Sequence, residues 1–197
     1  MYLPNLSEVN FMKKNEIKNI TLSAMFLGLG LVLPLLTGQI QVIGRMLLPM
    51  HIPVLLCGLI CGWQYGLTIG FILPLMRSVI FSMPPMYPTA VAMAFELATY
   101  GFVVGFLFAN AKWQCIKSLY RCLLTAMLLG RAVSGLANLI LLGIKGNSYT
   151  LSAFIAGHFT TAFPGIILQL ILIPSIMLLL NKTHLIPFKK NQKYETV

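Results

Sequence analysis

Long apolar segments separated by short polar ones dominate the chain. A helix needs about 20 apolar residues to cross the hydrocarbon core of a membrane. Measured against that length, the pattern predicts six membrane helices, at 18–36, 49–62, 65–82, 89–110, 119–142 and 151–181. The second segment, opened by Pro49 and closed by Gly62, is short for a crossing. The fold class expected is therefore an all-α integral membrane protein with six transmembrane helices.

Composition supports the same class. Of the 197 residues, 58% are hydrophobic and only 9% are charged, whereas a soluble domain of this size would need more charge at its surface. The net charge of +10 comes from short segments between apolar runs. That distribution is typical of the inner loops of a membrane protein and not of a nucleic-acid-binding surface.

The same basic segments predict the orientation, because inner loops carry an excess of Lys and Arg. With the N-terminus inside, the outer loops hold only Arg45 and Lys145. The inner segments then hold Lys13, Lys14, Lys18, Lys112, Lys117, Arg121, Lys182, Lys189, Lys190 and Lys193. Both termini are therefore expected in the cytoplasm. The membrane domain, 18–181, lies between a cytoplasmic N-terminal segment, 1–17, and a basic cytoplasmic tail, 182–197.

A few ionisable side chains lie inside the apolar segments, where each costs roughly 2.5–3.5 kcal/mol at the centre of the bilayer. Glu96 is about 12 Å along its helix from Pro88, at 1.5 Å per residue. The positions predict that polar groups from several helices converge in the outer half of the bundle, while the inner half is bare apart from Gln169. The candidate substrate-binding residues are Arg45, Arg77, Tyr87, Glu96, Arg131, Asn138 and His158.

Two interpretations of these groups are compatible. Glu96, Arg131 and His158 form the floor of a pocket that opens outward, or Glu96 and Arg131 form an ion pair that fixes the helix register. The outer segments "SMPPMYP" and "GIKGNSYT" are rich in Gly, Pro and Tyr. Such loops are suited either to a lid over a small ligand or to plain connections.

The sequence lacks several motifs that drive transport or catalysis in other proteins. It contains no G-x-x-x-x-G-K-[ST] loop for ATP, no H-E-x-x-H and no Asp. The four cysteines suit packing inside helices better than a metal site. We expect no catalytic residue, no metal and no cofactor in this chain. A membrane protein with an outer pocket and no energy source of its own needs a partner that supplies the energy.

One long stretch of the sequence resembles a known family. The runs "PVLLCGLICGWQYG" (53–66) and "MPPMYPTA…FE" (83–96) are similar to those of substrate-binding S components of energy-coupling factor (ECF) transporters, and the resemblance extends over 18–181. It implies a non-enzymatic subunit of a bacterial plasma membrane importer. Such a subunit captures a vitamin or related micronutrient at the outer face. Its partners are a transmembrane coupling protein and two ATPases, which use the ATP.

The resemblance also suggests a docking face and a substrate. Family members dock on the coupling protein through small residues of the first helix, for which the nearest match here is Ala24, Gly28 and Gly30. The sequence is most similar to members assigned to pantothenate, and a guanidinium suits its carboxylate. Other members bind folate, riboflavin, pyridoxine, cobalamin or hydroxymethylpyrimidine.

Two other functions are compatible with the residues. A proton-driven secondary carrier could use Glu96 and would transport without a partner. An intramembrane hydrolase could use Ser134 and His158, in an arrangement that resembles a rhomboid-type dyad. The local string "AVSG" lacks the glycine two residues before the serine that the rhomboid motif carries.

Overall fold

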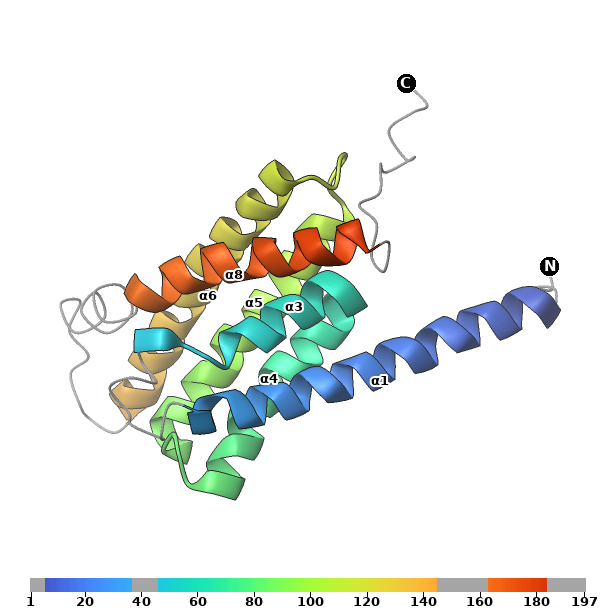
Figure 1. Ribbon diagram of the computed structural model, residues 1–197. Helices are drawn as coiled ribbons and strands as arrows, with labels where there is room; N and C mark the ends of the chain where they lie inside the picture. Colours follow the sequence, from blue (N-terminus) through green and yellow to red (C-terminus); the bar gives the residue numbers. More distant parts are fainter. Residues whose placement is uncertain (1–5, 37–45, 145–162, 184–197) are drawn as a thin grey trace.

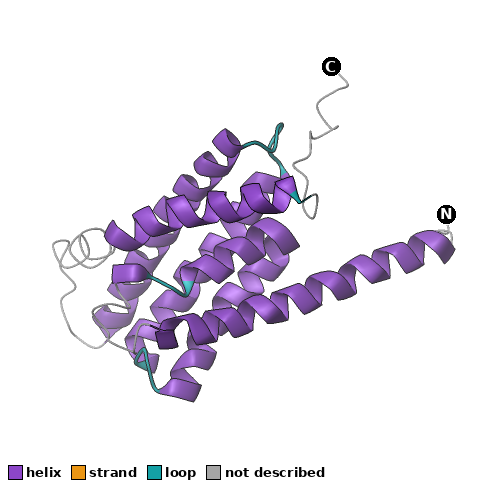
Figure 2. Ribbon diagram, in the orientation of Figure 1, coloured by secondary structure: helices purple, strands orange, loops and turns teal. Residues whose placement is uncertain are grey.

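The computed structural model describes residues 6–36, 46–144 and 163–183, and its regular elements are helices (Figure 2). In chain order they are α1 (Leu6–Leu36), α3 (His51–Cys61), α4 (Trp63–Phe81), the π-helical turn η1 (Met86–Ala90), α5 (Val91–Ala109), α6 (Ile116–Ile144) and α8 (Phe163–Lys182). The all-α class predicted from the sequence is confirmed.

Five of the described helices are long and apolar enough to cross a membrane: α1, α4, η1 with α5, α6 and α8. Helix α3 has 11 residues and a length of about 17 Å, which is little more than half the hydrocarbon thickness. The chain is therefore a multi-pass membrane protein. The count of six crossings stays a prediction, and the predicted start of the last crossing, 151–162, lies outside the described residues.

The basic segments gather at one end of the bundle. The start of α1, the connection between α5 and α6 and the end of α8 all lie at this end (Figure 1). It carries the exposed side chains of Lys18, Lys112, Lys117, Arg121 and Lys182. The opposite end is formed where α1, α4 and α6 end and where α3, α5 and α8 begin. This arrangement is the one that the positive-inside count requires, and the side of the membrane stays a prediction.

Helices α3, α4 and α5 meet through glycines. Gly62, with φ +104°, makes the turn between α3 and α4, a conformation that side chains rarely allow. A Cβ atom added to Gly101 would lie 2.2 Å from the carbonyl oxygen of Gly66, and one added to Gly58 would lie 2.5 Å from that of Gly101. The three backbones approach so closely only because these positions have no side chain.

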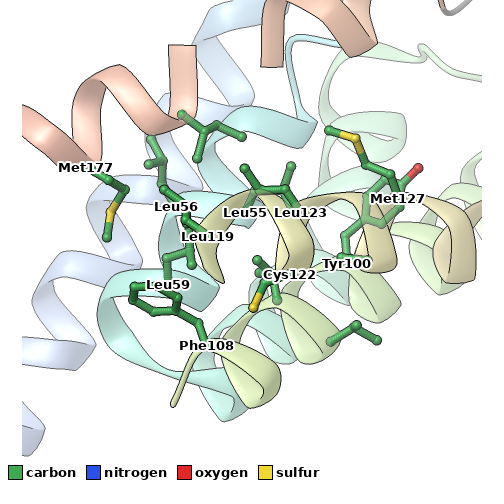
Figure 3. Packing of buried hydrophobic residues seen from close by; sticks show 14 of the residues in the cluster. Leu55, Leu56, Leu59, Tyr100, Phe108, Leu119, Cys122, Leu123, Met127 and Met177 are labelled. Atoms are coloured by element: carbon green, nitrogen blue, oxygen red, sulfur yellow. The ribbon is translucent and has the colours of Figure 1, made fainter. Parts of the chain in front are cut away.

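Two apolar clusters fill the bundle on either side of this junction. The main cluster joins α3, α5, α6 and α8, with Leu55, Tyr100, Leu123 and Met177 among its buried members (Figure 3). The second cluster joins α1, α3, α4 and α5 through residues such as Leu73. Helices α3 and α5 therefore serve both clusters, while the outer faces of α1, α6 and α8 expose apolar side chains, as lipid contact requires.

Candidate functional site

Four buried polar side chains, one from each helix of the main cluster, lie close to the apolar packing. We call these four side chains the polar layer. Its members are His51 of α3, Glu96 of α5, Arg131 of α6 and Gln169 of α8, with exposed fractions of 1%, 6%, 3% and 1%. A buried charge or amide inside a membrane protein is costly, so such a concentration indicates a site.

The helix period explains why the four side chains share one level. Residues four apart lie on the same face of a helix. His51 precedes Leu55 by four positions, Gln169 precedes Ile173 by four, and Arg131 follows Met127 by four, all three apolar partners being in the main cluster. Helices α3 and α8 begin at the end opposite the basic segments, and α6 ends there. Each polar residue therefore lies one helical turn closer to that end than its apolar partner.

Tyr100, four residues after Glu96 on α5, links the layer. Its hydroxyl donates a hydrogen bond to Oε1 of Glu96 at 3.0 Å and also interacts with the guanidinium of Arg131. Its ring packs against α6 at Gly130, where an added Cβ would lie 2.2 Å from a ring carbon. The two opposite charges of the layer, from α5 and α6, are thus joined through one buried phenol.

His51 completes the surroundings of Glu96. Its Nε2 lies 3.8 Å from Oε1 of Glu96, an ion-pair distance that is too long for a hydrogen bond. The His51 and Tyr100 rings are tilted at 55°, with their centroids 5.2 Å apart. The lone carboxylate of the apolar segment is therefore in contact with groups from α3 and from its own helix.

The structure places other candidate residues away from the layer. Arg77 donates a hydrogen bond from Nη1 to the carbonyl of Leu31 at 3.0 Å, and its guanidinium lies 5.4 Å from the centroid of the Phe81 ring. It follows Leu73 of the second cluster by one turn, so it joins α4 to α1. Arg45 and His158 lie outside the described residues.

Two further candidates lie nearer the end of the bundle. Asn138, two turns beyond Arg131, is half-buried and donates a hydrogen bond to the carbonyl of Ser134 at 2.9 Å within α6. Tyr87 is exposed, and its hydroxyl donates to the carbonyl of Leu141. This hydrogen bond joins the segment that contains Tyr87 to the last turn of α6, which lies closer to the end of the bundle than the polar layer does.

The small residues of α1 divide between two faces. Ala24 is exposed, and nothing lies within 4 Å of a Cβ added to Gly28. Gly30 is buried, and an added Cβ would lie 2.5 Å from the side chain of Leu73. The open face of α1 therefore contains Ala24 and Gly28, whereas Gly30 packs inside the bundle.

Sequence reasoning missed His51 and Tyr100 and placed Gln169 in the inner half. The spacing of Tyr100 from Glu96, one helical turn, was a usable signal for a partner on the same face. Gln169 lies six residues after the start of α8 at Phe163, and so belongs to the polar layer. His51 gave no signal of its own beyond its place in the run "PMHIP".

The layer combines one imidazole, one carboxylate, one guanidinium and one amide. In the part of the chain that the structure describes, no group of three His, Cys, Asp or Glu side chains is arranged to hold a metal. Ser134 is buried one turn from Arg131. The fold and the site together define a class of protein, a multi-pass helical membrane protein with hydrogen-bonding side chains buried toward one end.

A comparison with protein families gives this class its name. The family model for the substrate-specific component of ECF transporters matches residues 18–177, and the chain belongs to that family. No curated protein and no solved structure matched it. The chain is accordingly a transport subunit and not an enzyme, which removes the hydrolase interpretation. It works with a small-molecule substrate and with the membrane and ATPase module of an ECF importer.

Proposed function

We propose that this chain captures a vitamin or related micronutrient, with pantothenate as the first candidate, at the outer face of a bacterial plasma membrane. The observation that carries the proposal is the polar layer, which lies next to the main apolar cluster. It lies toward the end of the bundle opposite the exposed basic residues. A small polar ligand there would be screened from water on its inner side by Leu55, Leu123 and Ile173.

Release into the cell would require the partner module. The chain's sequence has no ATP-binding loop, so a transmembrane coupling protein and two ATPases supply the energy. We place the docking face at Ala24 and Gly28, because small residues on an open helix face let a second helix approach closely. Arg131 and Glu96 remain the residues proposed to meet the ligand, with Asn138 and Tyr87 nearer the entrance.

Uptake by vesicles tests the division of labour. The chain alone should bind radiolabelled pantothenate without accumulating it, and accumulation should begin when the coupling protein, the ATPases and ATP are present. Uptake by the chain alone, driven by a pH gradient and lost in Glu96→Gln, would instead identify a secondary carrier and sink the proposal.

The docking face has its own test in the complete importer. Gly28→Leu should lower ATP-driven uptake by about tenfold or more while ligand binding to the isolated chain is unchanged. Gly143→Leu is the matched control, since an added Cβ there also meets nothing within 4 Å. Equal uptake by the two variants would remove Gly28 from the interface.

A further inference from the structure

Two side chains of the polar layer have hydrogen-bonding atoms without a partner in the part of the chain that the structure describes. Among the described residues, neither ring nitrogen of His51 has a hydrogen-bond partner, and neither does Nε2 of Gln169. Both residues are buried, with 1% of their surface exposed. Buried polar groups are nearly always hydrogen-bonded, because an unmet donor or acceptor loses its water without replacement.

The two side chains lie on helices that pack together. Helices α3 and α8 are in contact, and Leu55 and Ile173, one turn inward from His51 and Gln169, belong to one cluster. Gly165 of α8 approaches the segment before α3, with an added Cβ 2.5 Å from the carbonyl oxygen of Met46. His51 and Gln169 therefore belong to the α3–α8 side of the layer.

The chemistry of these atoms specifies what they can bind. A neutral imidazole has one N–H donor and one accepting nitrogen, and the amide nitrogen of Gln169 is a donor. Hydroxyl and amide groups both donate and accept, so such groups of a ligand can partner either ring nitrogen of His51 and can also accept from Gln169. A carboxylate only accepts, so it would leave the accepting nitrogen of a neutral imidazole unmet.

The charges of the layer also disfavour a ligand carboxylate beside His51. The carboxylate of Glu96 already interacts with Tyr100, which Arg131 also contacts, so one anion and one cation are present. A ligand carboxylate beside His51 would bring a second anion next to Glu96, whose Oε1 is only 3.8 Å from Nε2. Two like charges at buried positions repel strongly.

This inference rests on the proposed function. We infer that the end of the ligand that enters the polar layer is uncharged, with hydroxyl or amide groups that hydrogen-bond to His51 and Gln169. A ligand carboxylate remains outside the layer, toward the entrance. For pantothenate this means that the hydroxyl and amide half lies inside and the carboxylate half faces out. His51 and Gln169 are then the residues that determine specificity.

A matched pair of ligands tests this orientation on the wild-type chain. Pantothenol has a primary alcohol where pantothenate has its carboxylate. Titration of the full chain in detergent should give dissociation constants for the two within about threefold, because the group that differs lies outside the layer. Binding of pantothenate with a loss of roughly 100-fold or more for pantothenol would overturn the inference and leave the proposed function standing.

Variants test the two residues directly. His51→Phe keeps a ring against Tyr100 but removes both nitrogens, and Gln169→Leu removes the amide. Each should weaken binding of both ligands by about tenfold or more. Gln64→Leu, on an exposed position of α4, is the matched control and should bind as the wild type does. Unchanged affinity in folded His51→Phe, judged by a single monodisperse peak, would overturn the inference.

The identity of the ligand does not limit the test. If pantothenate fails to bind and riboflavin, folate or pyridoxine binds instead, the same variants are titrated with that vitamin, and a tenfold loss in His51→Phe supports the inference (about 1.4 kcal/mol). If the wild-type chain binds no member of the panel, the proposed function and the inference fall together.

Discussion

Replacing Gly130 by Ala should disturb the polar layer without touching any of its polar atoms. The added Cβ would lie 2.2 and 2.4 Å from two carbons of the Tyr100 ring, whereas carbon atoms in contact are about 3.5–4.0 Å apart. The ring must therefore move by more than about 1 Å. A displacement of that size breaks the 3.0 Å hydrogen bond from Tyr100 to Glu96.

The magnitude follows from three contributions. Overpacking a well-packed site costs about 1–3 kcal/mol. Loss of the side-chain hydrogen bond from Tyr100 to Glu96 costs about 1 kcal/mol, and Ala is favoured over Gly inside a helix by about the same amount. The last two nearly cancel, so a net loss of about 1–3 kcal/mol is expected. For a chain of this length that corresponds to a fall in melting temperature of several degrees.

Thermal unfolding in detergent, followed by tryptophan fluorescence, measures the change, and ligand titration should show weaker binding by about tenfold. Gly143→Ala is the control on the same helix, because an added Cβ meets nothing within 4 Å there. The control should match the wild type or exceed it slightly. Equal stability and affinity for both variants would refute the role assigned to the Tyr100 contact with α6.

Three further changes test other parts of the account. Gly101→Ala should lower the melting temperature by several degrees while Gly28→Ala does not, because only the first meets backbone within 2.2 Å; similar melting curves would contradict the glycine junction. Glu96→Gln should weaken ligand binding by about tenfold in equilibrium titration, since the buried charge and its partners are lost; wild-type affinity would leave the carboxylate a structural role. Tyr87→Phe should speed ligand release a few-fold in a stopped-flow experiment by freeing the loop from α6, with little effect on stability, and an unchanged release rate would remove Tyr87 from the entrance.

Much of the fold could be predicted because its physical signals are local. Apolar runs of the right length predicted the long helices, and the distribution of Lys and Arg predicted which connections share one end. The short helix α3 was recognised as too short to cross easily, although it ends one residue before Gly62 and begins later than expected. Its close contact with α4 and α5 depends on glycines from three segments, a match that no single segment reveals.

The site was less accessible from the sequence. Glu96 and Arg131 stood out because a charge in an apolar run is conspicuous, and the structure brings them to the same phenol. Arg77 stood out equally, yet it binds the backbone of α1, since depth along a helix does not determine which face a residue occupies. His51 was not recognised and Gln169 was assigned to the inner half, because their significance depends on the packing of α3 against α8.

The central claim is that the isolated chain holds a small molecule in its polar layer. The most direct measurement is purification of the full chain in mild detergent, denaturing extraction and mass spectrometry of whatever is released, followed by titration with the vitamin panel. The account predicts one tightly bound vitamin per chain and a dissociation constant that rises in Glu96→Gln. A folded chain that releases nothing and binds no vitamin of the panel would contradict it.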